Sequence, residues 1–239
     1  MYNTNLSYLK KENHMIAAHE PVDSIDIAAD SIDACFADTA VHFLKIDAEG
    51  GELEILKGAQ HQLQHEILGV RAEVAFAPIL ENRPLFGEIH TYLTALGFEL
   101  LNFDYDGRGL AKGPFAKPER YGKLIATDAV WICNESRIFS NTSTRNIADI
   151  VRLATFLMLN QATDVAISLL LNARSKGILF SDLWEDSLFS HLHFIIMSLV
   201  KDLSYSPQIE KNALFTAYET IFEREFPDLN RYYEQDEFS

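Results

Sequence analysis

Cysteines, long apolar runs and metal-ligand patterns are all scarce in this sequence. Its 239 residues include only two cysteines, Cys35 and Cys133, and neither has the Cys/Cys or Cys/His spacing of a metal site. We therefore expect no metal, and a reduced, cytoplasmic protein. No apolar stretch approaches the roughly 20 residues that a membrane span needs, and residues 1–11 lack the apolar core of a secretory signal. Neither membrane insertion nor secretion is expected.

Basic residues are also few. The chain has 20 Lys and Arg against 35 Asp and Glu, which gives a formal net charge of -15. Such a charge repels a phosphate backbone, so a nucleic-acid partner is not expected. With 48% hydrophobic residues, the chain can still bury one core or two small ones.

Two kinds of pattern meet near residues 134–144, where polar residues interrupt the apolar periodicity. Before this join, short β-rich runs alternate with helical patterns, which is typical of a doubly wound α/β sheet. After it, only helical periodicity appears. We predict an α/β domain over residues 1–139 and a helical region over residues 140–239.

The α/β part is predicted to contain four strands with helices between the first three. A helix begins at Glu52, and Ser24 or Asp26 is expected to cap a short helix upstream. A loop instead of a helix precedes the last strand, which predicts antiparallel pairing of the last two strands. The predicted strands are residues 41–46, 70–76, 98–103 and 124–133; further helices are predicted at 85–96 and 146–160 and from 165, 181 and 206, and residues 107–109 are expected to be loop.

Residues 43–59 join the first strand to the helix through a tight turn and carry several carboxylates. Ligands of open α/β sheets bind beyond the carboxyl ends of the strands, where Asp47 and Glu49 fall. A carboxylate there could orient or deprotonate a hydroxyl, and Asp47 is the first candidate for this catalytic role. Glu49 and Glu52 are the second candidates. For Glu52 a structural role is favoured over a functional one, because an acid in the first turn of a helix is stabilised by the exposed amides.

This segment, F-L-K-I-D-A-E-G-G-E-L-E-I-L-K-G-A, resembles the signature of the FkbM methyltransferase family. The signature is an apolar strand followed by K-I-D-x-E-G-x-E and a helix with L-x-G-A. Similar flanks occur at residues 24–26, 72–74 and 86–98, so the resemblance covers about residues 22–133, the C-terminal half of the family's domain. It implies transfer of a methyl group from S-adenosylmethionine to a hydroxyl of a sugar or other small molecule. It also implies a partial Rossmann-like sheet of the class I methyltransferase type, followed here by an α-helical C-terminal region.

The glycine-rich turn that holds the cofactor in this family is not found, so the cofactor-binding residues stay unassigned. Gly50, Gly51 and Glu52 are the candidates, because the glycines let the backbone approach a ligand without a Cβ clash. Two hypotheses remain open: a methyltransferase, and a non-catalytic, truncated methyltransferase-like scaffold that binds a protein partner. On either hypothesis, four explanations of the missing glycine-rich turn are expected: a truncated gene product, a misassigned start, a degenerate relative, or a site that another chain completes.

Two further expectations concern the first strands. The outer edge of residues 41–46 is too apolar to face water, which predicts cover by a protein partner, a second copy of the chain, residues 1–21 or the helical tail. Glu73 interrupts an otherwise apolar strand. It is expected either to face a ligand or to pair with a cation such as Lys45.

Overall fold

The computed structural model describes residues 3–10, 23, 25–104, 107–109, 123–140, 145–178 and 216. The chain forms two compact units, Met1–Ile138 and Phe139–Ser239. The boundary between them falls within the polar join of residues 134–144.

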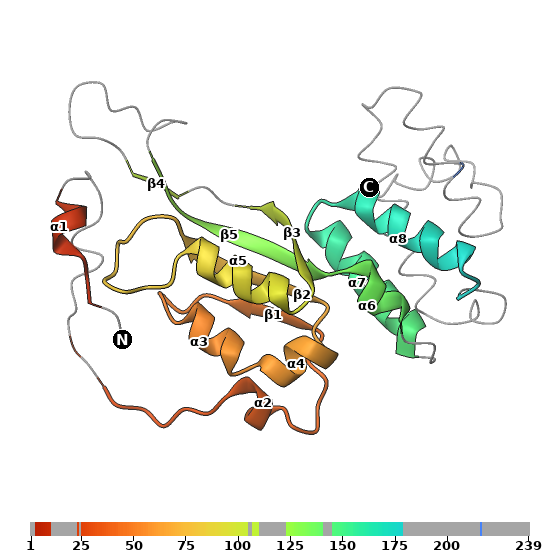
Figure 1. Cartoon of the computed structure of the whole chain (residues 1–239), viewed down its shortest axis with the longest axis horizontal. Coiled ribbons are helices and arrows are strands. Elements are labelled where there is room, and N and C mark those ends of the chain that lie inside the picture. The colour runs from red at the N-terminus through yellow and green to blue at the C-terminus, as the bar shows by residue number, and fades with distance from the viewer. Residues whose placement is uncertain are drawn as a thin grey trace, which may run out of the picture. The chain divides into compact units, whose positions relative to one another are not determined.

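The first unit is built on a mixed sheet in the order β1-β2-β5-β3, with the short β4 beside β5 (Figure 1). β1 and β2 are parallel, whereas β5 is antiparallel to each of its neighbours. The four predicted strands and the antiparallel last pair are thereby confirmed. The expectation of a plain loop at residues 107–109 is wrong, because this segment pairs with the beginning of β5. The strands are β1 (Phe43–Ile46), β2 (Gly69–Ala75), β3 (Phe98–Phe103), β4 (Gly107–Gly109) and β5 (Lys123–Cys133).

The helix predicted from Glu52 is two helices, α3 (Glu52–Lys57) and α4 (Gln60–His65). Gly58 separates them, and a Cβ at this position would lie only 3.3 Å from the Cβ of Ser31. This close approach favours glycine, which is also a poor helix former. Asp33 then accepts hydrogen bonds from the first amides of α4, at 2.8 and 3.0 Å.

The short helix α2 (Ile32–Cys35) begins later than the sequence predicted. Its N-cap is Ser31, whose hydroxyl accepts from the amide of Ala34 at 3.2 Å. A cap at Ser24 or Asp26 is therefore wrong; Ser24 itself lies outside the described residues.

The segment between α2 and β1 is held by the buried side chain of Gln62. Its amide nitrogen donates to the carbonyls of Phe36 and Thr39, at 2.9 and 3.0 Å. Its oxygen accepts from the amide of Val41 at 3.0 Å. One side chain on α4 thus fixes the chain just before β1, and with it the start of the candidate site.

The core of this unit lies where α3 and α5 (Phe86–Ala95) pack on β2 and β3. Alternate residues of β2 are fully buried, as expected for one face of a strand, and Trp131 on β5 lies opposite Val70. The indole of Trp131 donates to His90 Nδ1 at 3.2 Å. α5 ends as predicted before Gly97, which has a left-handed φ of 82°. This packing sets the register and hence the faces on which the polar side chains of β1 and β2 emerge.

The described N-terminal residues contact the loop that follows β2. The amide of Asn5 donates to Ile79 O at 2.9 Å, and the amide of Glu81 donates to Asn3 O at 2.7 Å. α1 (Leu6–Leu9) then buries Leu9 against Ile79 and Leu80. The N-terminal residues therefore hold the loop after β2 through backbone hydrogen bonds and through apolar packing.

In the second unit, α7 (Arg145–Leu159) and α8 (Thr163–Ser175) pack together through buried residues such as Leu153, Leu157 and Leu169. They match the first two helices predicted for the tail. The short α6 (Glu135–Phe139) spans the boundary between the units. The helices predicted from residues 181 and 206 lie outside the described residues. Within the described part of the chain, no helix combines the length and apolar character needed to cross a membrane.

Candidate functional site

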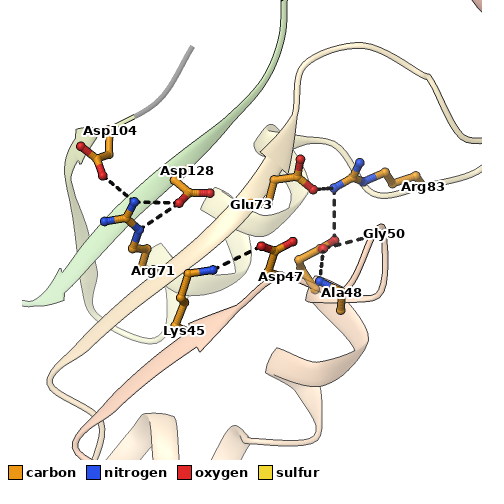
Figure 2. A network of polar contacts seen from close by, with 10 residues as sticks. Lys45, Asp47, Ala48, Gly50, Arg71, Glu73, Arg83, Asp104 and Asp128 are labelled. Atoms are coloured by element: carbon orange, nitrogen blue, oxygen red, sulfur yellow. Dashed lines mark hydrogen bonds and ion pairs between the residues drawn. The ribbon is translucent and has the colours of Figure 1, made fainter. Parts of the chain in front are cut away.

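The turn after β1 is held from inside by Glu52. This side chain is 1% exposed, and its Oε1 accepts from the amides of Ala48 and Gly50, both at 3.1 Å (Figure 2). Two successive residues of the turn, Glu49 and Gly50, have left-handed φ values of 48° and 114°. Glu52 therefore has the structural role that the sequence favoured, although the amides it binds precede the helix.

The two glycines of the turn differ in what they do. Gly50 has a φ that side-chain-bearing residues rarely adopt, and its amide is bound to Glu52. A Cβ at Gly51 would meet Ala48 at 3.6 and 3.7 Å, which is ordinary van der Waals contact. Gly50 thus makes the sharp turn possible, whereas Gly51 has room for a side chain.

Asp47, Glu49 and Glu73 form a carboxylate cluster beyond the carboxyl end of β1. Each offers one oxygen, and these oxygens lie within 4.8 Å of one another. Asp47 and Glu49 are exposed, whereas the side chain of Glu73 on β2 is 25% exposed. The structure thus brings both proposed catalytic residues together with Glu73. Such oxygens are ligands that a hard divalent cation prefers, but exposed acids often gather without one, and the absence of a metal stays a prediction.

The cation that pairs with Glu73 is Arg83, not Lys45. Arg83 Nη2 donates to Glu73 Oε2 at 2.8 Å and lies 3.6 Å from Glu52 Oε2. Lys45 instead contacts Asp47 at 3.3 Å, and both of these side chains are more than half exposed. An exposed pair of this kind contributes little to stability.

Arg83 was missed by the sequence analysis, although it is the most buried charged group here besides Glu52, at 1% side-chain exposure. It lies in the loop between β2 and α5, where no periodic pattern marks it. The sequence held no local signal for it, because its carboxylate partners Glu52 and Glu73 come from other elements and meet it only in the fold.

The environment of Glu73 favours its protonated form. Burial raises the pKa of the Glu73 carboxyl, the hydrogen bond and charge of Arg83 lower it, and the charges of Glu49 and Glu52 raise it. The net effect is a pKa above the usual 4.5. Glu73 therefore holds a proton more strongly than an ordinary glutamate does.

A second polar group lies further along the same face of β2. Arg71 donates to Asp128 on β5 through Nε at 3.0 Å and Nη2 at 2.8 Å, and it also pairs with Asp104 just after β3 (Figure 2). The hydrogen bond to Asp128 is the main cause of a raised pKa for Arg71. This bridge ties β2 and β5 to the residue that follows β3, so we assign it a structural role.

An open α/β sheet with charged side chains just beyond the end of a parallel strand defines a class of domains that bind their ligands at this edge. Residues 3–100 match the family model described as the methyltransferase FkbM domain. The resemblance of the β1 motif to this family is thereby confirmed for this part of the chain. The match begins before residue 22 and ends within β3, so it leaves out β5. Comparisons with curated proteins and with solved structures gave no match.

Proposed function

We propose that the first unit takes part in transferring a methyl group from S-adenosylmethionine to a hydroxyl of a sugar or other small molecule. One observation carries the proposal. The segment that matches the FkbM methyltransferase family folds into a turn whose Asp47 and Glu49 carboxylates meet Glu73 beyond the end of β1.

The charge of the site suits this donor. Bound S-adenosylmethionine would supply an activated methyl group on a positively charged sulfonium. Among the described residues, four carboxylates, Glu52 and the three of the carboxylate cluster, lie beside two cations, Lys45 and Arg83. A positively charged ligand is favoured in such a field. Asp47 and Glu49 are the groups that would face it, because the carboxylate of Glu52 and the amide of Gly50 already bind each other.

The chain's own carboxylates have two tasks in this reaction. They accept a hydrogen bond from the acceptor hydroxyl and so fix the direction in which its oxygen attacks. One of them also takes the hydroxyl proton, a contribution typically worth roughly 10²- to 10⁴-fold in rate. A cytoplasmic setting belongs to the proposal, since the sequence has only two cysteines, Cys35 and Cys133, which lie far apart in the chain.

The proposal is tested by incubating the full chain with methyl-labelled S-adenosylmethionine and a panel of sugars and small hydroxyl compounds. We expect saturable donor binding by calorimetry and labelled product. Asp47→Asn should reduce transfer by roughly 100-fold or more, in line with loss of a general base or orienting group. The matched control is Glu54→Gln, an exposed acid on α3 that lies outside the carboxylate cluster. A folded chain that neither binds the donor nor labels an acceptor would overturn the proposal.

A second candidate is a methyltransferase-like scaffold that binds a protein partner or a second copy of the chain. It is favoured by β1, which stands at one end of the strand order and exposes 36% of Phe43. Edge strands of this kind can pair with another chain. The test is the molar mass in solution: Phe43→Lys should dissociate a complex built on β1, whereas Phe103→Lys, on the strand at the other end, should not.

A further inference from the structure

We propose that Glu73, held by Arg83, is the group that takes the proton of the acceptor hydroxyl. This inference rests on the proposed methyl transfer and assigns a role within it that the motif itself does not supply. Glu73 lies on β2, outside the K-I-D-A-E-G-G-E segment, and reaches the carboxylate cluster from the neighbouring strand.

The surroundings of Asp47 and Glu73 differ in the respects that matter for a base. Asp47 is 54% exposed and contacts the exposed ammonium of Lys45 at 3.3 Å. Glu73 is 25% exposed, and Arg83 binds its Oε2 at 2.8 Å. The second oxygen of Glu73 can therefore receive a proton without breaking that hydrogen bond. Asp47 is better suited to binding and orienting a ligand at the surface of the site.

Arg83 is the second observation that sets Glu73 apart. Its side chain is 1% exposed, and its Nε and Nη1 have no hydrogen-bond partner among the described residues. Only Glu73 and Glu52 compensate its charge there. A buried ion pair with unused donors is a costly way to stabilise a loop. Its presence at the carboxylate cluster is better explained by a need to hold one carboxylate in a fixed position and charge state.

Among the described residues, charged groups from several elements lie around Glu73. Burial and the neighbouring carboxylates raise its pKa, whereas Arg83 lowers it, so the proton affinity is the balance of the two. The groups are Asp47 and Glu49 from the turn after β1, Glu52 from α3, Arg83 from the loop after β2, and Asp128, opposite Glu73 on β5, with its partner Arg71.

The acceptor's O–H bond breaks, its proton passes to the Glu73 carboxylate, and the electron pair forms the new bond from oxygen to the methyl carbon. The pair of the broken carbon–sulfur bond stays on sulfur, which becomes a neutral thioether. Glu73 then releases its proton to water and regains its charge beside Arg83.

The first arm of the test measures Glu73 itself, without the donor. The carboxyl carbon of Glu73 is titrated by NMR in the wild-type chain, in Arg83→Lys and in Arg83→Met. We expect a midpoint above 4.5 in the wild type and a higher one in Arg83→Met, because removing the guanidinium leaves burial and the acidic neighbours. The Glu73 midpoint in Arg83→Lys should lie between these two values. Arg83→Lys also keeps a cation at this position, so it serves as the test variant if Arg83→Met does not fold. A wild-type midpoint at or below 4.5 would overturn the proposal.

The second arm measures methyl transfer against pH. Transfer needs ionised Glu73, so the rate should fall as pH falls through its pKa, and Arg83→Lys should move this acidic limb to higher pH. Glu73→Gln should lower transfer by roughly 10²- to 10⁴-fold, a much larger change than the one expected in donor affinity from the loss of a single charge. The matched control is Glu99→Gln, an exposed glutamate on β3.

The outcomes separate this inference from the function on which it rests. If Glu73→Gln retains the wild-type rate while Asp47→Asn loses it, Glu73 is not the base and the methyltransferase proposal stands. If the folded wild-type chain neither binds donor nor transfers methyl groups, both are overturned.

Discussion

Glu52 is the side chain whose replacement tests most directly how the turn after β1 is built. Glu52→Ala removes the acceptor of two amide hydrogen bonds, both 3.1 Å long, and one of the two carboxylates near the buried Arg83. A hydrogen bond to a charged group contributes about 1.5–3 kcal/mol. Ala48 is exposed, so water can replace the lost partner there, whereas Gly50 is buried and its amide stays unsatisfied. We therefore expect the free energy of unfolding to fall by about 3 kcal/mol.

The assay is urea unfolding of the full chain, followed by far-UV circular dichroism and by tryptophan fluorescence, for which the fully buried Trp131 is a reporter in this unit. Glu52→Gln keeps an acceptor oxygen and loses the charge, so about half the effect is expected. The matched control is Glu54→Ala, an exposed acid in the same first turn of α3, which should change stability by less than about 0.5 kcal/mol. Hydrogen exchange of the Gly50 amide should become faster in Glu52→Ala but not in Glu54→Ala.

The competing expectation is that Glu52 serves a ligand and contributes little to the fold. Glu52→Ala would then match Glu54→Ala in stability, and the Gly50 amide would exchange at the same rate in both. That result would refute the structural role assigned to Glu52.

Three further predictions concern the same unit. Gln62→Glu should lower the free energy of unfolding, measured in urea at pH 7, by about 3 kcal/mol, because a carboxylate cannot donate to the two carbonyls that Gln62 binds. The loss should be smaller at pH 4, where the introduced acid is protonated and can donate. Because the pKa of Glu73 is raised in the folded chain, the folded chain binds more protons than the unfolded chain. The free energy of unfolding should therefore fall as pH rises from 4.5 through the folded pKa, and the urea midpoints of Glu73→Gln should lack this pH dependence. Burial, and then the charge of Asp33, raise the pKa of Tyr92; stability should therefore fall as pH rises above 10, whereas thermal unfolding of Tyr92→Phe should show a smaller loss.

The strands were predictable because burial imposes a short-range pattern on them. Alternate residues of β2 face the core, and Gly97 marks the end of α5 by its left-handed backbone. The break between α3 and α4 was not predictable in this way. It depends on how closely Ser31 approaches Gly58, a contact between segments far apart in the sequence. The cap of α2 was misplaced because Ser24, Asp26 and Ser31 can all cap a helix, and the sequence alone does not show which of them does.

In the candidate site, too, the residues of a contiguous motif were predictable and a residue paired only through the fold was not. Asp47 and Glu49 were found because they lie in one contiguous motif next to a strand end. Arg83 was not, because its partners Glu52 and Glu73 come from a helix and a strand that only the folded sheet brings together. A single sequence records the motif, whereas the pairing of a buried cation is a property of the fold.

Glu49 gives independent support for a functional turn. Its φ of 48° is unusual for a residue with a side chain and costs on the order of 1–2 kcal/mol relative to ordinary backbone. Glycine at this position would remove the strain. The turn accepts glycine at the two following positions, Gly50 and Gly51. The amides on either side of Glu49 bind Glu52 and hold the turn, whereas the exposed Glu49 carboxylate accepts no hydrogen bond from the described residues. Strained backbone gathers at functional sites, so the φ of Glu49 supports the role proposed for its carboxylate beside Asp47 and Glu73.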